Sequence, residues 1–572
     1  MTMNKVLNRR LMKISAIKTI TKAFIALGLL NVGFSSAGFA QEIDKEVYVV
    51  RPYEPVVSDA DKINFLPSTD DVEITPPQFK YSITPKKAEQ SLVPEPINPA
   101  RMVAVSLPRI YKSYIKVGLG NYFTPLAEFN ISNIHSRDYS YGLYLYHKSS
   151  HSNIRLINND KVPGGYSDSY ASLYGKRMYD NAVLSADISL MHNGFNYYGY
   201  NTNLFESDSL PEMERDSIRQ VGYLAGFDLA LSSSYTDSSH LNYNISVGYD
   251  YFGDREENRE GIFSLKSTFS KNYNGLQAGL DAGFDVFNLR ADTDTSSNTI
   301  IRINPWIGKN SRDWRFRVGL EATTDVHDIA NFYVYPRANL DIIIIKNVLV
   351  PFIGIDGKMQ ARDYHSLFEE NNFILPGLKL RNTSHNFIAY AGIKGSISNA
   401  VSFRADISYD IIKNMHFFIN DTITPLQNHF MTETDDADLV TYHGQLNIKP
   451  GPRLTLLFEG NYYSYNMLTL AKPWHKPEYE ISLGSVFNAS EKLSFDAEAI
   501  IIGNRWVKQD LFTEGMLKLD PLVDVNLKVN YHVSKVFTLF FNLYNITDRS
   551  NMIWNQYPSQ QFNFLGGLSY KL

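Results

Sequence analysis

Apolar and polar residues alternate along most of this chain. In the stretch 314–322 every second residue is apolar: Trp314, Phe316, Val318, Leu320 and Ala322. Successive side chains of a β-strand point to opposite faces, so this pattern gives each strand one apolar and one polar face. It recurs from Tyr114 to Leu572 with few helical interruptions. A bilayer demands an apolar exterior from a closed barrel while the lumen stays polar. We therefore predict an all-β fold, a transmembrane antiparallel β-barrel.

The connections between the expected strands alternate in length. Ten short ones lie near residues 134–138, 180–181, 235–239, 272–273, 311–312, 346–347, 398–399, 450–452, 489–490 and 533–534. Longer ones fall at 150–166, 196–218, 363–380, 415–437, 466–477, 505–519 and 549–560. Outer-membrane barrels have short periplasmic turns and longer outside loops. Ten inner turns, with both chain ends inside, predict about 22 strands, in a range of about 20 to 22.

Charged residues fall on the polar face of these strands. An arginine facing lipid at the midplane would cost about 2–4 kcal/mol, so we expect the charges to face the lumen. Both signs occur, which favours a cross-braced or plugged interior over a strongly ion-selective channel. The lumen-facing candidates are Arg302, Arg315, Arg317, Glu321, Arg337, Asp341, Asp356, Lys358, Arg404, Asp406, Asp496 and Glu498.

The N-terminal residues differ from the rest of the chain. Residues 1–40 combine six basic residues, no acidic one, and an apolar core from Ala23 to Phe34, which is typical of a signal peptide. Ten of the 24 prolines lie within residues 41–108, so residues 41–110 are expected to form an extended segment in the periplasm or the lumen. The barrel is expected to occupy residues 111–572.

Composition narrows the possible functions. Removal of residues 1–40 would take six of the 55 Lys and Arg residues and shift the formal net charge from −5 to −11, which argues against nucleic acid as a partner. The chain has 37 Tyr, 34 Phe and no Cys. Tyrosine suits a lipid boundary, and the lack of cysteine excludes disulfides and thiolate metal sites.

Catalytic and metal-binding signatures are scarce. There is no Gly-x-Ser-x-Gly elbow, phosphate loop or His-Glu-x-x-His motif, and His475 and His532 stand singly. The acidic groups at 292–294 and 433–438 fall in expected outside loops, but they lack the spacing and glycine of a calcium loop. We interpret them as solvated loop residues. The chain is predicted not to be an enzyme and to hold neither cofactor nor metal.

Four segments carry a resemblance to a known family: Gly118–Pro125, Tyr141–Ser150, Phe541–Asp548 and the closing stretch Phe562–Leu572. Together they resemble the barrel of TonB-dependent outer-membrane receptors, in the subgroup that lacks the globular plug, over roughly residues 110–572. That resemblance implies a barrel in the outer membrane of a Gram-negative bacterium and a role in transport. The 68 proline-rich residues ahead of the barrel are too few for the plug of such a receptor.

One short segment is similar to the TonB box, which adds a strand to TonB in the periplasm. It comprises Glu46, Val47, Tyr48, Val49 and Val50, and an ordinary extended segment is the alternative interpretation. The leading hypothesis is a plug-less barrel for passage of solutes, or the membrane subunit of an envelope complex. The alternative is a scaffold that recruits periplasmic or surface partners through residues 41–110. The expected partners are outer-membrane lipid and a periplasmic or surface protein that closes the lumen.

Overall fold

The computed structural model describes residues 111–572 except 134–135, 137, 206–210, 212–213, 236–239, 292–294, 328, 379 and 509–514. The predictions for residues 1–40, for residues 41–110, including the TonB-box-like segment, and for the acidic group at 292–294 therefore concern residues outside the described part. No helix in the described part of the chain is long and apolar enough to cross a membrane.

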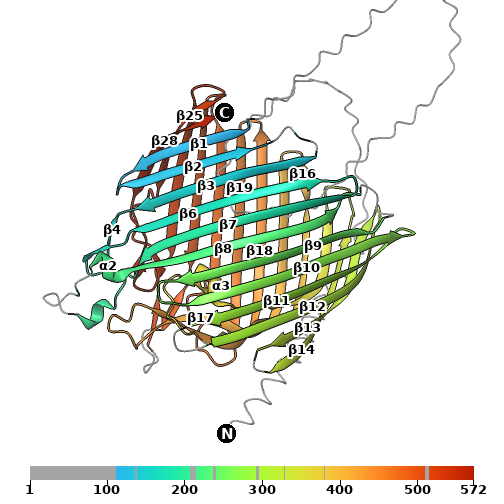
Figure 1. Cartoon of the computed structure of the whole chain (residues 1–572), viewed down its shortest axis with the longest axis horizontal. Helices are drawn as coiled ribbons and strands as arrows, with labels where there is room; N and C mark the ends of the chain where they lie inside the picture. The colour runs from blue at the N-terminus through green and yellow to red at the C-terminus, as the bar shows by residue number, and fades with distance from the viewer. Residues whose placement is uncertain are drawn as a thin grey trace, which may run out of the picture. The chain divides into compact units, whose positions relative to one another are not determined.

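One antiparallel sheet of 22 strands makes up the fold, and it closes on itself because β1 pairs with β28. Figure 1 shows these two strands side by side. The strands of the sheet are β1(Ser113–Gly120), β2(Thr124–Ser132), β3(Tyr139–Ser150), β6(Tyr166–Met178), β7(Ala182–Asn196), β8(Arg219–Ser233), β9(Asn242–Asp254), β10(Arg259–Tyr273), β11(Leu276–Arg290), β12(Thr295–Asn310), β13(Trp314–Val326), β14(Ala330–Ile342), β15(Val350–Gln360), β16(Thr383–Ser398), β17(Val401–Asn420), β18(Phe430–Gly451), β19(Leu454–Met467), β20(Tyr479–Asn488), β21(Leu493–Gly503), β24(Leu522–His532), β25(Phe537–Tyr544) and β28(Asn563–Lys571).

Each strand pairs with its neighbours in chain order, and each predicted short connection lies at or beside a turn between two paired strands. For example, Ser398 ends β16 and Val401 begins β17, while Tyr273 and Leu276 flank the turn between β10 and β11. The prediction of a closed antiparallel barrel of about 22 strands is confirmed. We call the end with these ten turns, where Tyr111 and Leu572 also lie, the inner end, and the end with the long connections the outer end.

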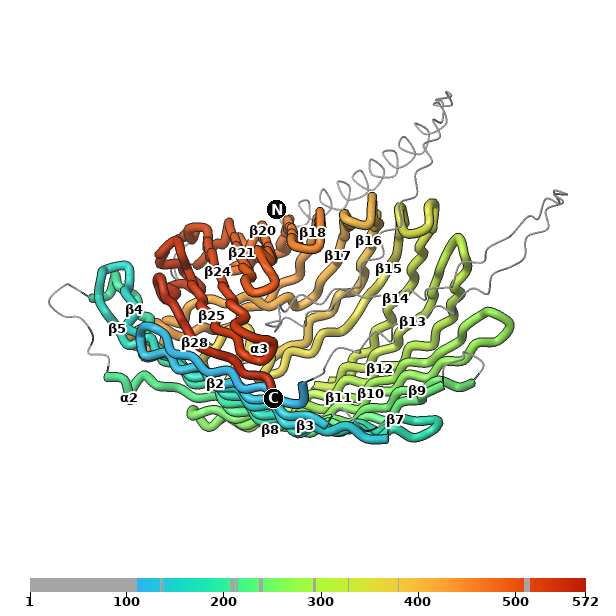
Figure 2. Tube along the Cα trace, turned by 90° about the horizontal axis from the view of Figure 1, so that it is seen from above, coloured from blue at the N-terminus to red at the C-terminus, as the bar shows by residue number. Residues whose placement is uncertain are grey.

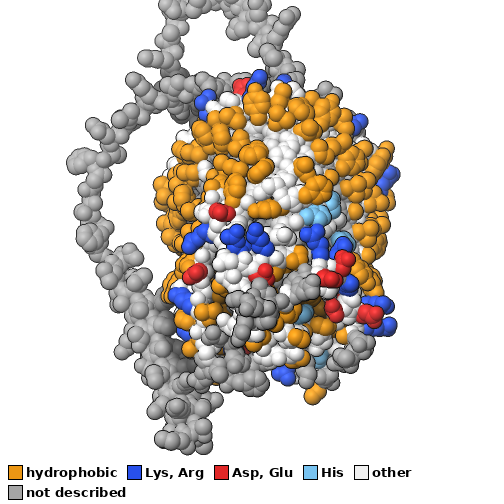
Figure 3. Space-filling model, turned by 90° about the vertical axis from the view of Figure 1, so that its left-hand side faces the viewer, with side chains coloured by type: hydrophobic (Ala, Val, Ile, Leu, Met, Phe, Trp, Pro, Cys, Tyr) orange, Lys and Arg blue, Asp and Glu red, His pale blue; other side chains and the backbone are white. Residues whose placement is uncertain are grey.

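The outside of the barrel is apolar where the alternation requires it. Leu320, Val318 and Val334 are 52%, 46% and 48% exposed, although they are large hydrophobic residues. Figure 3 shows such side chains gathered in a wide band over the strands, with charged residues beyond it. In water this exposure would be costly, whereas a band of this kind suits a lipid boundary.

One predicted detail was wrong, and a second depends on a shift of the strand register. The connection expected at 415–437 is only 421–429, because β17 and β18 continue as a long hairpin, and the acidic group at 433–438 therefore lies in β18 and not in a loop. Secondly, the register between β15 and β16 shifts between Asp356 and Lys358. Strict alternation does not carry across such a bulge, so Lys358 cannot be assigned to a face by counting from Asp356.

The outer connections contain their own secondary structure. It consists of three small hairpins, a 3-10 turn and two short helices: β4(Asn153–Arg155) with β5(Lys161–Pro163), β22(Trp506–Lys508) with β23(Met516–Lys518), β26(Met552–Trp554) with β27(Tyr557–Pro558), η1(Thr202–Leu204), α2(Arg215–Ile218) and α3(Tyr364–Glu370). Figure 1 shows β4 and α2 at the outer end, and Figure 2 places α3 inside the ring of strands.

Candidate functional site: a lid of outer connections

The outer connections fold together into a hydrophobic core. We call the described parts of 151–165, 197–218, 361–382, 421–429, 468–478, 504–521 and 545–562 the lid. Its core joins residues that are far apart in the chain, among them Ile154, Tyr198, Phe368, Phe430 and Tyr557. Loops that merely project into solvent do not bury side chains of this size, because only contacts between loops can shield them. The lid is therefore a packed layer that spans connections from many parts of the barrel.

Tyr557 stands at the centre of the lid and is completely buried. Its ring stacks on Phe373 at 3.6 Å between centroids and meets Tyr198 edge-on at 5.0 Å. Its hydroxyl donates a hydrogen bond to the backbone oxygen of Asn428 at 2.6 Å, and Tyr198 donates to Pro558 at 2.8 Å. Burial raises the pKa of Tyr557 well above its usual value, so the hydroxyl stays protonated and remains a donor. Four connections therefore meet at one ring.

The approach of two connections at this point requires a glycine. A Cβ atom added to Gly199 would lie 2.8 Å from the backbone oxygen of Gln556 and 2.9 Å from the ring of Tyr557. Both are closer than real Cβ contacts, and the backbone oxygen has no freedom to rotate away. The backbones of 197–218 and 545–562 pack this closely only because position 199 has no side chain.

Helix α3 lies within the lid, and hydrogen bonds with residues of β9 and β10 hold its first turn. The carboxylate of Glu260 accepts hydrogen bonds from the backbone N–H groups of Tyr364 at 3.1 Å and His365 at 2.8 Å. The hydroxyl of Tyr364 donates to Asp254 at 2.9 Å. Acceptor oxygens are favourable at a helix start, where backbone N–H groups have no partner within the helix. The side chain of Asp363 caps the same turn, because it accepts a hydrogen bond from the backbone N–H of Ser366.

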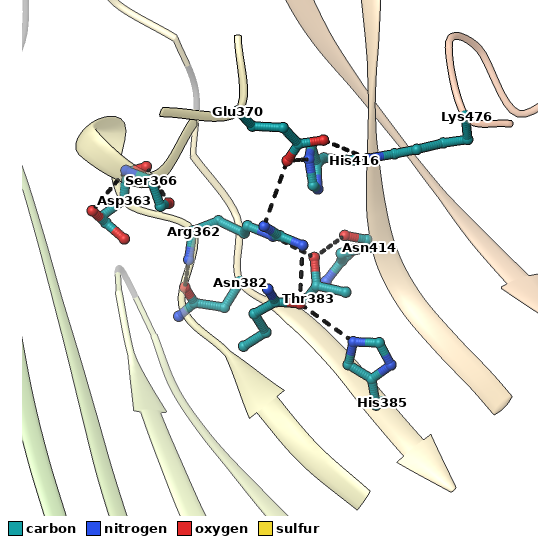
Figure 4. A network of polar contacts seen from close by, with 11 residues as sticks. Arg362, Asp363, Ser366, Glu370, Asn382, Thr383, His385, Asn414, His416 and Lys476 are labelled. Atoms are coloured by element: carbon teal, nitrogen blue, oxygen red, sulfur yellow. Dashed lines mark hydrogen bonds and ion pairs between the residues drawn. The ribbon is translucent and has the colours of Figure 1, made fainter. Parts of the chain in front are cut away.

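The other end of α3 is held by β17 and by the connection 468–478. Glu370 contacts Nε2 of His416 at 2.7 Å and Nζ of Lys476 at 2.5 Å, with the Arg362 guanidinium 3.9 Å away. Figure 4 shows these groups converging on one carboxylate. Burial alone would raise the pKa of Glu370, but the hydrogen bonds from His416 and Lys476 and the positive charge of Lys476 outweigh it and hold this pKa well below its usual range. We call Glu370, His416, Lys476 and Arg362 the latch.

Arg362 extends the latch to the barrel wall. Its Nη2 donates to Gln360 at 2.9 Å, its Nε donates to Thr383 at 3.4 Å, and its backbone N–H donates to Asn382 at 3.0 Å. Thr383 in turn donates to the backbone oxygen of Asn414 at 2.9 Å (Figure 4). The two ends of the α3 connection are thus tied to each other and to β16 and β17.

Two further buried groups connect the remaining parts of the lid. His475 contacts the backbone oxygen of Phe418 through Nδ1 at 2.8 Å, and burial lowers the pKa of His475 to about 3. The ring is therefore neutral at pH 7, with its Nδ1–H donating. Arg505 donates to the backbone oxygen of Ile553 at 2.6 Å, which joins the connections 504–521 and 545–562. Buried hydrogen bonds of this kind favour one arrangement of the connections. If the partner moves away, a buried polar atom is left without a hydrogen bond, which costs free energy.

Most of the predicted lumen charges lie in ion pairs. Arg315 contacts Asp341 at 3.3 Å, and Arg404 contacts Asp406 at 2.7 Å. Arg337 lies between Glu321 at 2.9 Å and Asp356 at 3.2 Å, on the face of β14 opposite to the exposed Val334.

Three candidates have a partner that the sequence did not single out. Arg302 pairs with Asp285, and Arg317 pairs with Asp281 at 2.6 Å. Asp341 has a second partner, Lys394, at 3.1 Å. In the ladder between β21 and β24, Asp496 lies opposite Lys528 and Glu498 lies opposite Asn526. The predicted set is therefore brought together along neighbouring strands but not into one cluster.

The sequence interpretation did not find the lid. It treated the outer connections as loops and weighed only their acidic groups. A signal was nevertheless present, because Tyr197, Tyr198, Tyr200, Trp554 and Tyr557 lie in connections where solvated polar residues would be the rule. Aromatic residues at this density indicate that the connections have something to pack against.

No protein-family model matches the sequence, and no curated protein does. The fold, in contrast, matches solved structures. The FrpB iron transporter from Neisseria meningitidis is 9% identical, with 82% of each chain covered and a TM-score of 0.63. The siderophore receptor PirA from Acinetobacter baumannii is 11% identical, with 80% of each chain covered and a TM-score of 0.60.

A third match is the pyoverdine outer-membrane receptor FpvA from Pseudomonas aeruginosa PAO1. It is 11% identical, with 81% of this chain and 78% of that chain covered and a TM-score of 0.59. The TM-scores and the coverage establish a shared fold, and identities this low establish nothing finer. The chain therefore has the barrel fold of outer-membrane transport receptors. These matched proteins are transporters and receptors and not enzymes, in agreement with the sequence prediction.

Proposed function

We propose that this chain is an outer-membrane barrel for gated passage of solutes and that its own lid closes the outer end. A barrel of 22 strands is wide enough to breach the permeability barrier unless something fills it. The observation that carries the proposal is the lid core around Tyr557, which joins connections from around the barrel. A gate made of several packed connections can open by separating them, whereas a fixed wall cannot.

The barrel works, in this proposal, without an N-terminal plug domain, because the lid takes over the task of closure. Support comes from the depth of burial of Tyr198, Phe430 and Tyr557, which matches that of a protein core. Further support comes from the paired charges of β11–β15, which in this proposal brace the lumen face and leave it polar. Polar lumen walls suit hydrated solutes. The matched iron and siderophore receptors make a transported solute the leading class of cargo.

Conductance across planar bilayers tests this function. Purified wild-type protein should remain mostly closed. The variant Tyr557→Ala should conduct, because loss of a fully buried aromatic side chain costs about 3–5 kcal/mol of packing within the lid. Tyr179→Ala is the matched control, since Tyr179 is 53% exposed and lies in the turn between β6 and β7 at the inner end. Heat-modifiable migration on a gel establishes that each variant retains a folded barrel.

The second candidate is a membrane subunit or scaffold that recruits a periplasmic or surface partner through residues 41–110. The extent of the lid favours it, since a packed layer held by so many buried groups also suits a permanently closed barrel. If Tyr557→Ala does not conduct more than the wild type, gated passage is contradicted. A partner that co-purifies only when residues 41–110 are present would then support the scaffold.

A further inference from the structure

The outer wall of the barrel carries an apolar groove of about 520 Å³ over β1, β2, β3, β6 and β7. Its sides include large aliphatic residues and its floor two small ones: Ile115, Val117, Leu145, Leu190, Ala127 and Ala171. Leu145 and Leu190 are 40% and 55% exposed, and they share the face that alternation turns toward lipid. The groove is therefore open to the bilayer and not to the lumen.

Polar side chains mark the end of the groove that lies toward the outer end of the barrel. In the strand register Ala127 lies opposite His147, His147 opposite Ser169, and Ser169 opposite His192. Nδ1 of His147 contacts Oγ of Ser169 at 2.8 Å. Residues that lie opposite one another share a face, so two imidazoles and a hydroxyl follow directly on the apolar groove.

A second pocket, of about 290 Å³, continues this surface. Two residues farther along the same strands lie Ser149 and Ser167, which line it together with His151, Arg215 and Arg219. Asp216 is the one carboxylate among its lining residues. Arg255 adds a third guanidinium nearby, because it donates to the backbone oxygens of Asp216 at 3.2 Å and Arg219 at 2.7 Å.

Figure 3 views this side of the barrel, where β4 and α2 lie. It shows basic, histidine and acidic side chains together just beyond the edge of the hydrophobic band. This is the depth at which the headgroups of the outer leaflet meet a barrel, and the groove extends from it into the band. We call the second pocket the basic pocket. A lipid whose acyl chain lies in the groove, along the strands, would bring its headgroup to this pocket.

We propose that the groove and the basic pocket form one binding site for an anionic, phosphate-bearing lipid of the outer leaflet. An acyl chain fills the groove over Ala127 and Ala171. The phosphate lies between Arg215 and Arg219, whose planar guanidinium groups suit bidentate contact with phosphate oxygens. Ser149 and Ser167 supply hydroxyl donors. The excess of guanidinium over carboxylate in the lining selects an anion over a zwitterionic headgroup.

Lipid retention measured by native mass spectrometry tests the site. Protein equilibrated in detergent with bisphosphorylated lipid A should keep a bound lipid, whereas phosphatidylethanolamine at the same concentration should be lost. The double variant Arg215→Gln/Arg219→Gln should reduce retention of lipid A at least about tenfold, because each lost charge-assisted hydrogen bond weakens binding by about that factor. Ala171→Phe should reduce it independently by filling the groove.

Two control variants complete the experiment. Arg549→Gln removes an exposed arginine from another outer connection, and Ala405→Phe enlarges an exposed alanine of β17, so both should retain lipid A as the wild type does. Equal retention in all variants would overturn the proposal, as would equal retention of lipid A and phosphatidylethanolamine by the wild type. Heat-modifiable migration shows that each variant is folded, so a loss of lipid cannot be attributed to a loss of the barrel.

Discussion

The substitution Glu370→Gln changes the latch by a single atom. In the wild type each carboxylate oxygen has its own donor, with Nε2 of His416 on one and Nζ of Lys476 on the other. An amide has only one acceptor oxygen, so its NH₂ group must face one of these two donors. The variant therefore loses one charge-assisted hydrogen bond and weakens the other, while the volume of the side chain is unchanged.

The magnitude follows from these contacts. A hydrogen bond to a charged group contributes about 1.5–3 kcal/mol, and the weakened bond loses about half of that. The Glu370 side chain is 31% exposed, so solvent screening reduces the sum, and we expect about 2–3 kcal/mol for local opening of the α3 connection. Opening of that connection should then become about 30- to 150-fold more frequent.

Hydrogen–deuterium exchange measures this opening directly. The reporters are backbone N–H groups whose bonds join the α3 connection to β18, namely Leu375 to Phe430 and Phe430 to Phe373. Exchange at these amides should accelerate by the factor above. Glu369→Gln is the matched control on the same helix, since Glu369 is 59% exposed and its contact with His365 is 3.6 Å long. If both variants exchange at the same rate, the latch does not hold the lid.

Three further predictions concern the lid and the lumen. Because the pKa of Glu370 is depressed, its contribution to the stability of the closed lid is present at neutral pH and is lost as the pH falls below the usual carboxyl value of about 4.3. Amide exchange in the lid, corrected for intrinsic rates, should therefore rise in acid for the wild type but not for Glu370→Gln. Gly199→Val should loosen the lid and accelerate exchange at 197–205, whereas Gly275→Val, at a turn with open space but a positive φ, should affect only the inner end. Arg337→Ala should lower the unfolding temperature in detergent, because it leaves Glu321, whose side chain is 5% exposed, without its ion pair at a cost of about 2–3 kcal/mol. The control Arg453→Ala, in an exposed inner turn, should leave the unfolding temperature unchanged.

The barrel could be predicted from the sequence because its information is local. Alternation along single strands such as Trp314–Val326 fixes which face is apolar, and the short turns fix which strands are neighbours. The prediction was wrong where residues typical of a loop lie within a strand. The hairpin of β17 and β18 continues through a stretch that contains Asp435 and Asp436, and those residues are typical of loops by composition.

The lid could not be predicted because its contacts are not local. Tyr198 and Pro558 are 360 residues apart, and Tyr557 and Asn428 are 129 apart, so no periodicity relates them. The same holds for the latch, where Glu370 and Lys476 come from different connections. The predicted lumen charges could be identified from the sequence only in part. Alternation predicts that Arg302 and Arg317 lie on the polar face, but only the folded structure identifies Asp285 and Asp281 as their partners.

Accessibility of a single cysteine in the lumen tests the central claim, that the lid closes the outer end. The chain has no native cysteine, so each introduced thiol is unique. Ser408→Cys places one on the face of β17 that carries Asp406 and Asp410, and Ile423→Cys places one in the lid at a position that is 75% exposed. A membrane-impermeant maleimide added outside intact cells should label Ile423→Cys rapidly and Ser408→Cys only when Tyr557→Ala is also present. Labelling of Ser408→Cys as fast as Ile423→Cys in the otherwise wild-type chain would contradict the account.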